Sequence, residues 1–297
     1  MDRRHLRYLI ALAEEGGFTR AAERVGIAQP PFSKQIRDLE REVGALLVQR
    51  TPRGSVLTPA GTALVTRARE IELLFASAAT EARRIGQGLS GRLRVGFTES
   101  GIFHPLVVQI FLAFRARYPD VDLVLEEQLS TTLIAMLTAG ELDAAFIRPP
   151  LPAGDEWACR AIVREPMVVA FSEGHALTRQ KTVRLQTLEG ETFVFFHRRV
   201  RPGMTDTIIS ACERAGFEPR TSQVVPKITS ALRLVAAGAG VTVVPASLAS
   251  MVMDGVRFVA LDEPTLTAEI AIAWRPDTAS ALLENFIRAA TELAEQC

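Results

Sequence analysis

Five polar side chains suited to DNA contact lie close together near the start of one short amphipathic segment. They are Gln29, Ser33, Lys34, Gln35 and Arg37. Glutamine can form two hydrogen bonds with adenine, serine can bond to either partner of a base pair, and lysine and arginine suit phosphate or guanine. This combination predicts a surface that contacts double-stranded DNA.

Two short helices joined by a tight turn would carry this surface. In the first, apolar residues have the i, i+3, i+4, i+7 spacing of one helix face, at Phe18, Ala21, Ala22 and Val25. Gly26 tolerates a positive φ and ends that helix. The second helix begins near Pro31 and buries a stripe formed by Phe32, Ile36, Leu39 and Val43. The pattern predicts a helix-turn-helix whose second helix inserts its N-terminus into the major groove.

A basic segment after Gly44 predicts a wing that follows these helices. Arg50, Pro52, Arg53 and Gly54 stand where the tip of the wing is expected. An arginine at such a tip can enter the narrow minor groove of an A·T tract, and Arg53 is our first choice for this role. The alternative is that residues 31–43 present only a solvated face of alternating charge. The turn, the polar helix start and the wing occur together in order, which favours the DNA-binding interpretation.

This segment resembles the DNA-binding head of the LysR-type transcriptional regulators, and the resemblance continues across the whole chain. The residues that carry it are Phe18 to Ala22, Ala28-Gln29-Pro30, Ser33 to Ile36, Leu39-Glu40 and Leu57-Thr58-Pro59-Ala60-Gly61. The resemblance is closest to the regulators of aromatic-compound catabolism. It implies an all-α winged helix-turn-helix at 1–58, a linker helix and hinge at 59–91, and an effector-binding domain at 92–297. It also places Pro30 among the DNA-contacting residues.

The charge of the chain is unevenly distributed, although its formal net charge is zero. Residues 1–58 hold ten Lys or Arg and seven Asp or Glu, a net charge of +3, so the remainder carries −3. Sequence-independent affinity for DNA comes from neutralised phosphates, so a head of this charge should need a second copy. The charge distribution therefore predicts a DNA-binding dimer.

A long helix over residues 62–86 could supply the dimer contact. It lacks internal proline and glycine, and Leu64, Ile71, Ala78 and Ile85 repeat every seven residues. The alternative is a helix that packs only on its own domain. The family resemblance favours the paired helix, and Gly86, Gly88, Ser90 and Gly91 are expected to form a hinge after it.

From Leu93 onward, buried strands alternate with helices in two sets, which predicts two α/β lobes. The resemblance implies a sensor of periplasmic-binding-protein type with two Rossmann-like lobes. In that topology the chain crosses near Arg164 and returns near Thr267. Lobe I would then comprise 92–163 and 267–297, and lobe II would comprise 164–266.

Polar residues follow the predicted strands, where a ligand is expected in open α/β sheets. Hydroxyls and backbone N–H groups at helix starts, together with a cation, predict a site between the lobes for a small anion such as a carboxylate. The expected effector-binding residues are Thr98, Ser100, Ser130, Thr131, Arg148, Pro202, Gly203, Met204 and Ile228. Ser100, Ser130, Arg148, Pro202 and Met204 match effector-contacting positions of the resembling regulators. The alternative for Ser100 and Ser130 is that each caps a helix.

The resemblance also implies the partners and the mechanism. Two heads joined by linker helices would bind an interrupted palindrome of double-stranded DNA as a dimer or a tetramer. Effector binding would close the lobes, change the spacing of the heads and relax DNA bending, which would allow contact with RNA polymerase.

Other functional classes have little support. The four histidines are scattered, and the chain contains no HExxH, GxSxG or P-loop motif and no metal-ligand spacing, so neither an enzyme nor a cofactor is expected. The alternative function is a non-regulatory small-molecule binding protein. That function would require a signal peptide or a membrane partner, and it would leave residues 1–58 without a role. We therefore expect a cytoplasmic protein without a membrane partner.

Overall fold

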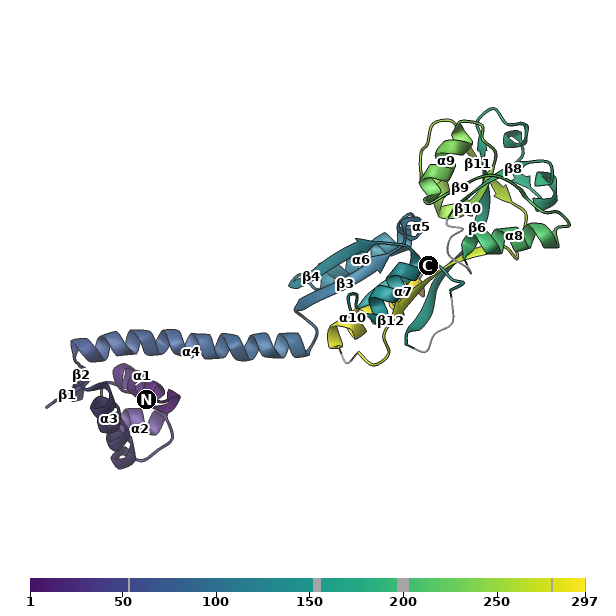
Figure 1. The fold of residues 1–297 in the computed structure, drawn as a ribbon. Helices are drawn as coiled ribbons and strands as arrows, with labels where there is room; N and C mark the ends of the chain where they lie inside the picture. The colour runs from purple at the N-terminus through teal and green to yellow at the C-terminus, as the bar shows by residue number, and fades with distance from the viewer. Residues whose placement is uncertain (53, 152–155, 197–202, 279, 297) are drawn as a thin grey trace. The chain divides into compact units, whose positions relative to one another are not determined.

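The computed structural model describes residues 1–52, 54–151, 156–196, 203–278 and 280–296. Contacts between Cα atoms divide the chain into two compact units, Met1–Arg84 and Ile85–Cys297, and each unit is described separately below. Figure 1 shows both units, with labels on many of their elements. Within the described ranges, no helix is both long enough and apolar enough to cross a membrane.

The first unit consists of helices, one hairpin and most of a long helix. Its elements are α1 (Arg3–Glu15), α2 (Phe18–Arg24), α3 (Gln29–Val43), β1 (Val48–Thr51), β2 (Gly54–Leu57) and α4 (Pro59–Gly86). Leu9, Phe32, Ile36 and Leu39 are fully buried in its core, so three residues of the expected α3 stripe face α1 and α2. The fourth, Val43, was expected to be buried but is 42% exposed at the end of α3. The winged helix-turn-helix is confirmed. The helix α1 was not identified from the sequence, and α3 begins two residues before the expected Pro31.

Two close backbone approaches fix the wing to this core. Ser55 N–H donates to Gly16 O at 2.9 Å, and a Cβ on Gly54 would lie 2.4 Å from that same oxygen. At the other end of the hairpin, Thr58 Oγ1 donates to Leu46 O at 2.7 Å. A Cβ on Gly61 would lie only 2.0 Å from Leu47 O. Only glycine permits these contacts, so the position of the wing depends on both glycines.

The helix α4 leaves much of its apolar surface uncovered in the single chain. Val65 and Ala68 are buried against the head, but Leu73 and Leu74 are 71% and 69% exposed, and Phe75 is 48% exposed. Contiguous exposed apolar side chains of this kind mark a surface available for association.

Lobe I of the second unit is a mainly parallel sheet covered by helices on both faces. Its elements are β3 (Gly91–Phe97), α5 (Glu99–Ile102), α6 (Pro105–Arg117), β4 (Val121–Glu127), α7 (Ser130–Thr138), β5 (Ala144–Ile147), β12 (Thr267–Trp274) and α10 (Ala281–Ala294). The strand β5 lies between β3, which is parallel to it, and β12, which is antiparallel. Its residues alternate: Phe146 packs against α6 and α10, and Ile147 packs against α7. Figure 1 shows these three helices beside the strands of lobe I.

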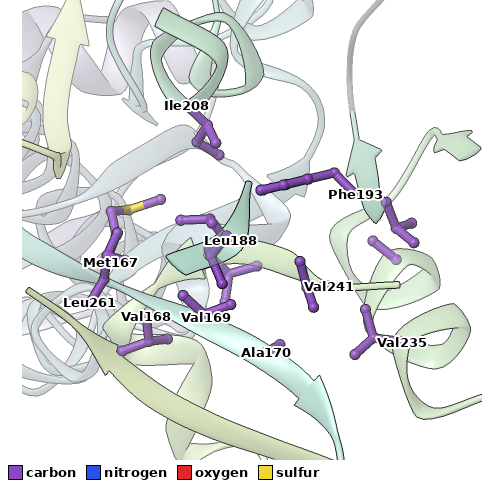
Figure 2. Close-up of a cluster of buried hydrophobic side chains, with 14 of the residues drawn as sticks. Met167, Val168, Val169, Ala170, Leu188, Phe193, Ile208, Val235, Val241 and Leu261 are labelled. Carbon is purple, nitrogen blue, oxygen red and sulfur yellow. The ribbon is translucent and has the colours of Figure 1, made fainter. Parts of the chain in front are cut away.

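Lobe II is reached along one long strand. Its elements are β6 (Ala158–Ser172), η1 (Ala176–Arg179), β7 (Thr182–Val183), η2 (Leu185–Leu188), β8 (Thr192–Phe196), α8 (Met204–Arg214), β9 (Arg220–Val225), α9 (Ile228–Ala236), β10 (Thr242–Pro245), η3 (Ala246–Ser250) and β11 (Val256–Leu261). The first half of β6 pairs with β12, and its second half pairs with β10 and β11. Figure 2 shows the lobe II core around Val169, Phe193 and Val241. A single strand therefore runs from one lobe into the other.

The segment after α4 is anchored on α10. The buried amide of Asn285 donates to Gln87 O at 3.1 Å and to Gly88 O at 3.2 Å. Gly88 has a φ of +67°, and a Cβ there would lie 2.5 Å from Leu282 N. The expected hinge at Gly86 to Gly91 is thus held against lobe I around Gln87 and Gly88.

Candidate functional site

The predicted DNA-contacting residues of α3 differ in accessibility. Lys34 and Arg37 are exposed, and within the described part of the chain neither forms an ion pair with a carboxylate. Gln29 is the first residue of the helix and is partly exposed. Ser33 is only 5% exposed, and its Oγ accepts a hydrogen bond from Gln29 Nε2 at 2.9 Å. Ser33 therefore orients Gln29 and presents little surface of its own, which differs from the expectation.

The remaining predicted contacts lie around the same helix end and on the wing. Pro30 is exposed and Gln35 is partly exposed. Arg50 is exposed on β1 with its guanidinium 4.7 Å from the centre of the Phe18 ring. Arg53 lies outside the described residues. Near the other end of α3, Glu40 Oε1 accepts from Leu47 N and Val48 N and so supports the start of the wing.

A cavity of about 80 Å³ lies between the lobes at the carboxyl ends of the strands. Residues from both lobes line it: Thr98, Glu99, Ser100, Leu129, Ser130, Thr131, Arg148, Pro150, Leu151, Phe196, Gly203 and Met204. Seven of the predicted effector residues meet in this lining. Ile228 is not among its lining residues, and Pro202 lies outside the described residues.

Arg148 is the most constrained residue of this cavity. Its side chain is 4% exposed, and its Nε donates to Ser100 Oγ at 2.9 Å. Its Nη2 donates to Ser100 O at 3.0 Å and to Glu165 Oε1 at 2.8 Å. Burial lowers the pKa of Arg148, and Glu165 opposes that shift. The Nη1 atom is buried without a hydrogen-bond partner within the described residues, so one donor group of this guanidinium is unused.

Glu165 is a residue of this site that was not identified from the sequence. It lies on β6 and is 5% exposed. Besides its ion pair with Arg148, it accepts from Ser247 N at 2.6 Å and from Ser247 Oγ at 3.1 Å. Ser247 belongs to η3 of lobe II, so Glu165 balances the buried cation and joins the two lobes. The sequence did offer a signal for Glu165, because a glutamate stands just before the apolar strand residues Met167 to Phe171.

The hydroxyls of the cavity have different roles. Thr98 is the N-cap of α5, and its Oγ1 accepts from Gly101 N at 3.2 Å. Ser100 and Ser130 are not N-caps, because the N-cap of α7 is Leu129. Ser130 Oγ instead accepts from Arg148 N at 3.1 Å, as Ser100 Oγ accepts from Nε. Both hydroxyls can therefore still donate their protons to an acceptor in the cavity.

Glu99 makes a second connection between the lobes. Its Oε2 accepts from Ile228 N at 3.3 Å, and its Oε1 accepts from Thr229 Oγ1 at 2.6 Å. Both partners lie at the start of α9, whose own N-cap residue, Lys227, forms no side-chain cap. Glu99 thus supplies from lobe I the cap that α9 lacks, and Ile228 bonds to Glu99 through its backbone.

Other reactive side chains of the described residues lie in structural surroundings. No group of three His, Cys, Asp or Glu that could hold a metal ion occurs in the part of the chain that is described. Cys212 is buried in lobe II, and burial raises the pKa of its thiol to about 12. His104 caps α6 through Nδ1, and burial lowers its pKa. These residues have structural roles.

Both units match known families, and similar proteins cover the whole chain. Residues 3–62 match the bacterial regulatory helix-turn-helix protein, lysR family, and residues 86–295 match the LysR substrate binding domain. The HTH-type transcriptional regulator BudR of Raoultella terrigena is 37% identical over 287 residues, with 97% of this chain and 99% of that protein covered. Full-length CbnR complexed with its target DNA has a TM-score of 0.86 at 29% identity, covering 99% of this chain and 100% of that one. The BenM effector binding domain with its effector benzoate has a TM-score of 0.61 at 25% identity, covering 69% and 90%.

Proposed function

The chain belongs to the LysR family of bacterial helix-turn-helix regulators, and we propose that its effector is a small carboxylate bound between the lobes of the sensor. As a member of this family it is a DNA-binding transcriptional regulator with an effector-binding domain. The proposal concerns the chemistry of the effector and the residues that hold it.

The observation that carries the proposal is the buried guanidinium of Arg148 with its unpaired Nη1. A buried cation with an unused donor favours an ionised acceptor, because hydrogen bonds to charged groups are the strong ones. Ser100 and Ser130 hold this guanidinium and its backbone, and each has a hydroxyl proton to donate. Leu129, Leu151, Phe196 and Met204 provide an apolar wall for the body of the ligand.

An aromatic carboxylate is the form of effector that we favour. The effector of the similar BenM domain is benzoate, which combines a carboxylate with an apolar ring. We propose that this chain belongs with regulators of aromatic-compound catabolism and that a ring packs on the apolar wall. The proposed ligand-binding set is Thr98, Ser100, Ser130, Thr131, Arg148, Gly203 and Met204, with Pro202 and Ile228 beside it.

Calorimetric titration of the full chain with benzoate and a panel of other small carboxylates tests this proposal. Arg148→Ala should lower the affinity for a bound carboxylate at least about tenfold, because it removes a charged hydrogen bond worth about 1.5–3 kcal/mol. Arg220→Ala removes an exposed arginine of β9 and serves as the matched control. Unchanged affinity in Arg148→Ala would exclude the proposed anion site.

For DNA recognition, we propose that Gln29 reads a base and that Lys34 and Arg37 contact phosphates, with Arg50 and Arg53 at the minor groove. Gln29→Ala should cost about 1–3 kcal/mol on the preferred site and relax base preference. Lys34→Ala should weaken all sequences alike and reduce the dependence of affinity on salt. Footprinting at two salt concentrations separates the two effects, and identical behaviour of both variants would contradict this assignment.

We further propose that two heads, paired through α4, occupy the half-sites of an interrupted palindrome in the cytoplasm. The exposed Leu73 and Leu74 support the pairing. Two dimers would form a tetramer through their sensors, and the bound carboxylate would favour the arrangement that allows contact with RNA polymerase. Small-angle scattering and DNA-bending assays, each with and without the bound carboxylate, test this switch. If neither the scattering profile nor the DNA bend angle changes when the carboxylate binds, the proposed switch is wrong.

A further inference from the structure

The carboxylate of Glu99 binds the N-terminus of α9 beside the cavity. Glu99 lines the cavity, and its two oxygens take the N–H of Ile228 and the hydroxyl of Thr229 at the start of α9. The N-terminus of a helix is a favourable anion site because unpaired N–H groups and the helix dipole meet there. In this protein the chain's own side chain fills that site.

Three ionised groups among the described residues meet at this cavity. Arg148 is the one cation among the described residues that line it, and it is paired with Glu165. Glu99 contributes a second carboxylate, so the three groups together carry a net charge of −1. One ligand carboxylate can use the unpaired Nη1 of Arg148, but a second would face Glu99 and would find no further cation among the described residues that line the cavity.

We propose that Glu99 is a specificity-determining residue that limits the cavity to ligands with a single carboxylate. The inference rests on the proposed carboxylate site at Arg148 and adds to it the class of effector. A monoanion places its charge at Arg148 and its uncharged end toward α9. A dianion of the same shape must bring a like charge toward Glu99 in a partly buried site, where electrostatic repulsion is screened less than in water.

Nitro compounds provide matched ligands for this test, because a nitro group has nearly the shape of a carboxylate but no net charge. We would titrate the full chain by calorimetry with 4-nitrobenzoate against terephthalate and with 3-nitropropionate against succinate. The wild-type protein should bind the monoanion of at least one pair about tenfold or more tightly than the dianion. Glu99→Gln should reduce that ratio to about threefold or less, mainly by improving the binding of the dianion.

Two controls keep the outcomes distinct. Glu127→Gln removes the same charge from an exposed position on β4 and should leave the ratio unchanged. Glu99→Asp keeps the negative charge and should keep the preference for the monoanion over the dianion. If Glu99→Gln does not fold, Glu99→Asp still tests the role of the charge at this position. Equal binding of mono- and dianion by the wild-type protein, or the same ratio in Glu99→Gln, would overturn the role of Glu99 and leave the site at Arg148 intact. If the wild-type protein binds no carboxylate at all, the proposed function itself fails and this inference falls with it.

Discussion

The buried pair of Arg148 and Glu165 should be strongly coupled in stability. Glu165 is only 5% exposed, and Arg148→Met alone leaves its carboxylate without a cation. Breaking such a buried pair typically lowers the free energy of unfolding by about 3–5 kcal/mol. The two hydrogen bonds from Ser247 remain, so we expect the lower end of that range. Glu165→Gln should cost a similar amount, because it leaves the guanidinium unbalanced. The double variant removes both charges and should be no less stable than either single variant.

Tryptophan fluorescence can follow this effect in the full chain. The protein has two tryptophans, Trp157 and Trp274, and both lie in the second unit, so their emission reports on the sensor and not on the head. A loss of about 3 kcal/mol in a unit of this size lowers its melting temperature by about 6–12 °C. The unfolding of two units is not a single transition, so a signal confined to one unit is required.

A surface pair on the same two strands provides the control. Arg164 Nη2 and Glu269 Oε2 are 2.9 Å apart across β6 and β12, but the Arg164 side chain is 67% exposed. Substitution of either residue of this surface pair should change the free energy of unfolding of the sensor by less than about 1 kcal/mol. If the losses from Arg148→Met and Glu165→Gln simply add in the double variant, the two charges are independent, and the inferred coupling is wrong.

Three further measurements test the packing and the ionisation described above. Gly61→Ala should lower the stability of the head by about 1–3 kcal/mol and weaken DNA binding, because the new Cβ would lie 2.0 Å from Leu47 O. The control is Gly17→Ala, whose Cβ meets no atom within 4 Å, so it should change neither stability nor DNA binding. At pH 8, Cys212 should react with a thiol reagent only after unfolding, because burial raises its pKa to about 12. Peptide mapping should find Cys159, the exposed cysteine of β6, already labelled in the folded protein. A hydrogen bond from Arg3 lowers the pKa of Glu72 below its ordinary 4.5. The ionised Glu72 therefore stabilises the head above pH 4.5, and this stabilisation is lost as the pH falls through the lower pKa of the folded state. When unfolding is followed by circular dichroism at decreasing pH, Glu72→Gln should lose less stability than the wild-type protein.

The sequence predicted those parts of the fold that depend on periodic burial. The spacing of Phe32, Ile36 and Leu39 reports one buried helix face, and the structure places all three in the core. The continuous apolar run at Ala144 to Ile147 indicated a strand buried on both faces, as β5 is. The helix α1 was missed although Asp2 caps it and Leu6, Leu9 and Leu12 line its buried side, so the signal was present.

The cavity was predictable only in part. The carboxyl ends of parallel strands converge, so Ser100, Ser130 and Arg148 could be expected to meet. The pairing of Arg148 with Glu165 depends on the place where β6 passes between the lobes, which no local pattern encodes. The contact of Glu99 with α9 joins residues 129 and 130 positions apart in the sequence, so it also required the folded chain.

The anchoring of Gln87 and Gly88 on Asn285 determines where the sensor can be cut from the rest of the protein. A fragment that begins at Ser90 would leave the Asn285 amide, 8% exposed in the intact chain, without both of its carbonyl acceptors and would remove the turn that packs on Leu282. Fragments and chimaeras that exchange the DNA-binding head should therefore be joined before Gln87, within the last turn of α4. A junction placed after Gly88 would sever the linker from α10 and yield a sensor that binds its ligand but cannot pass the signal to a grafted head.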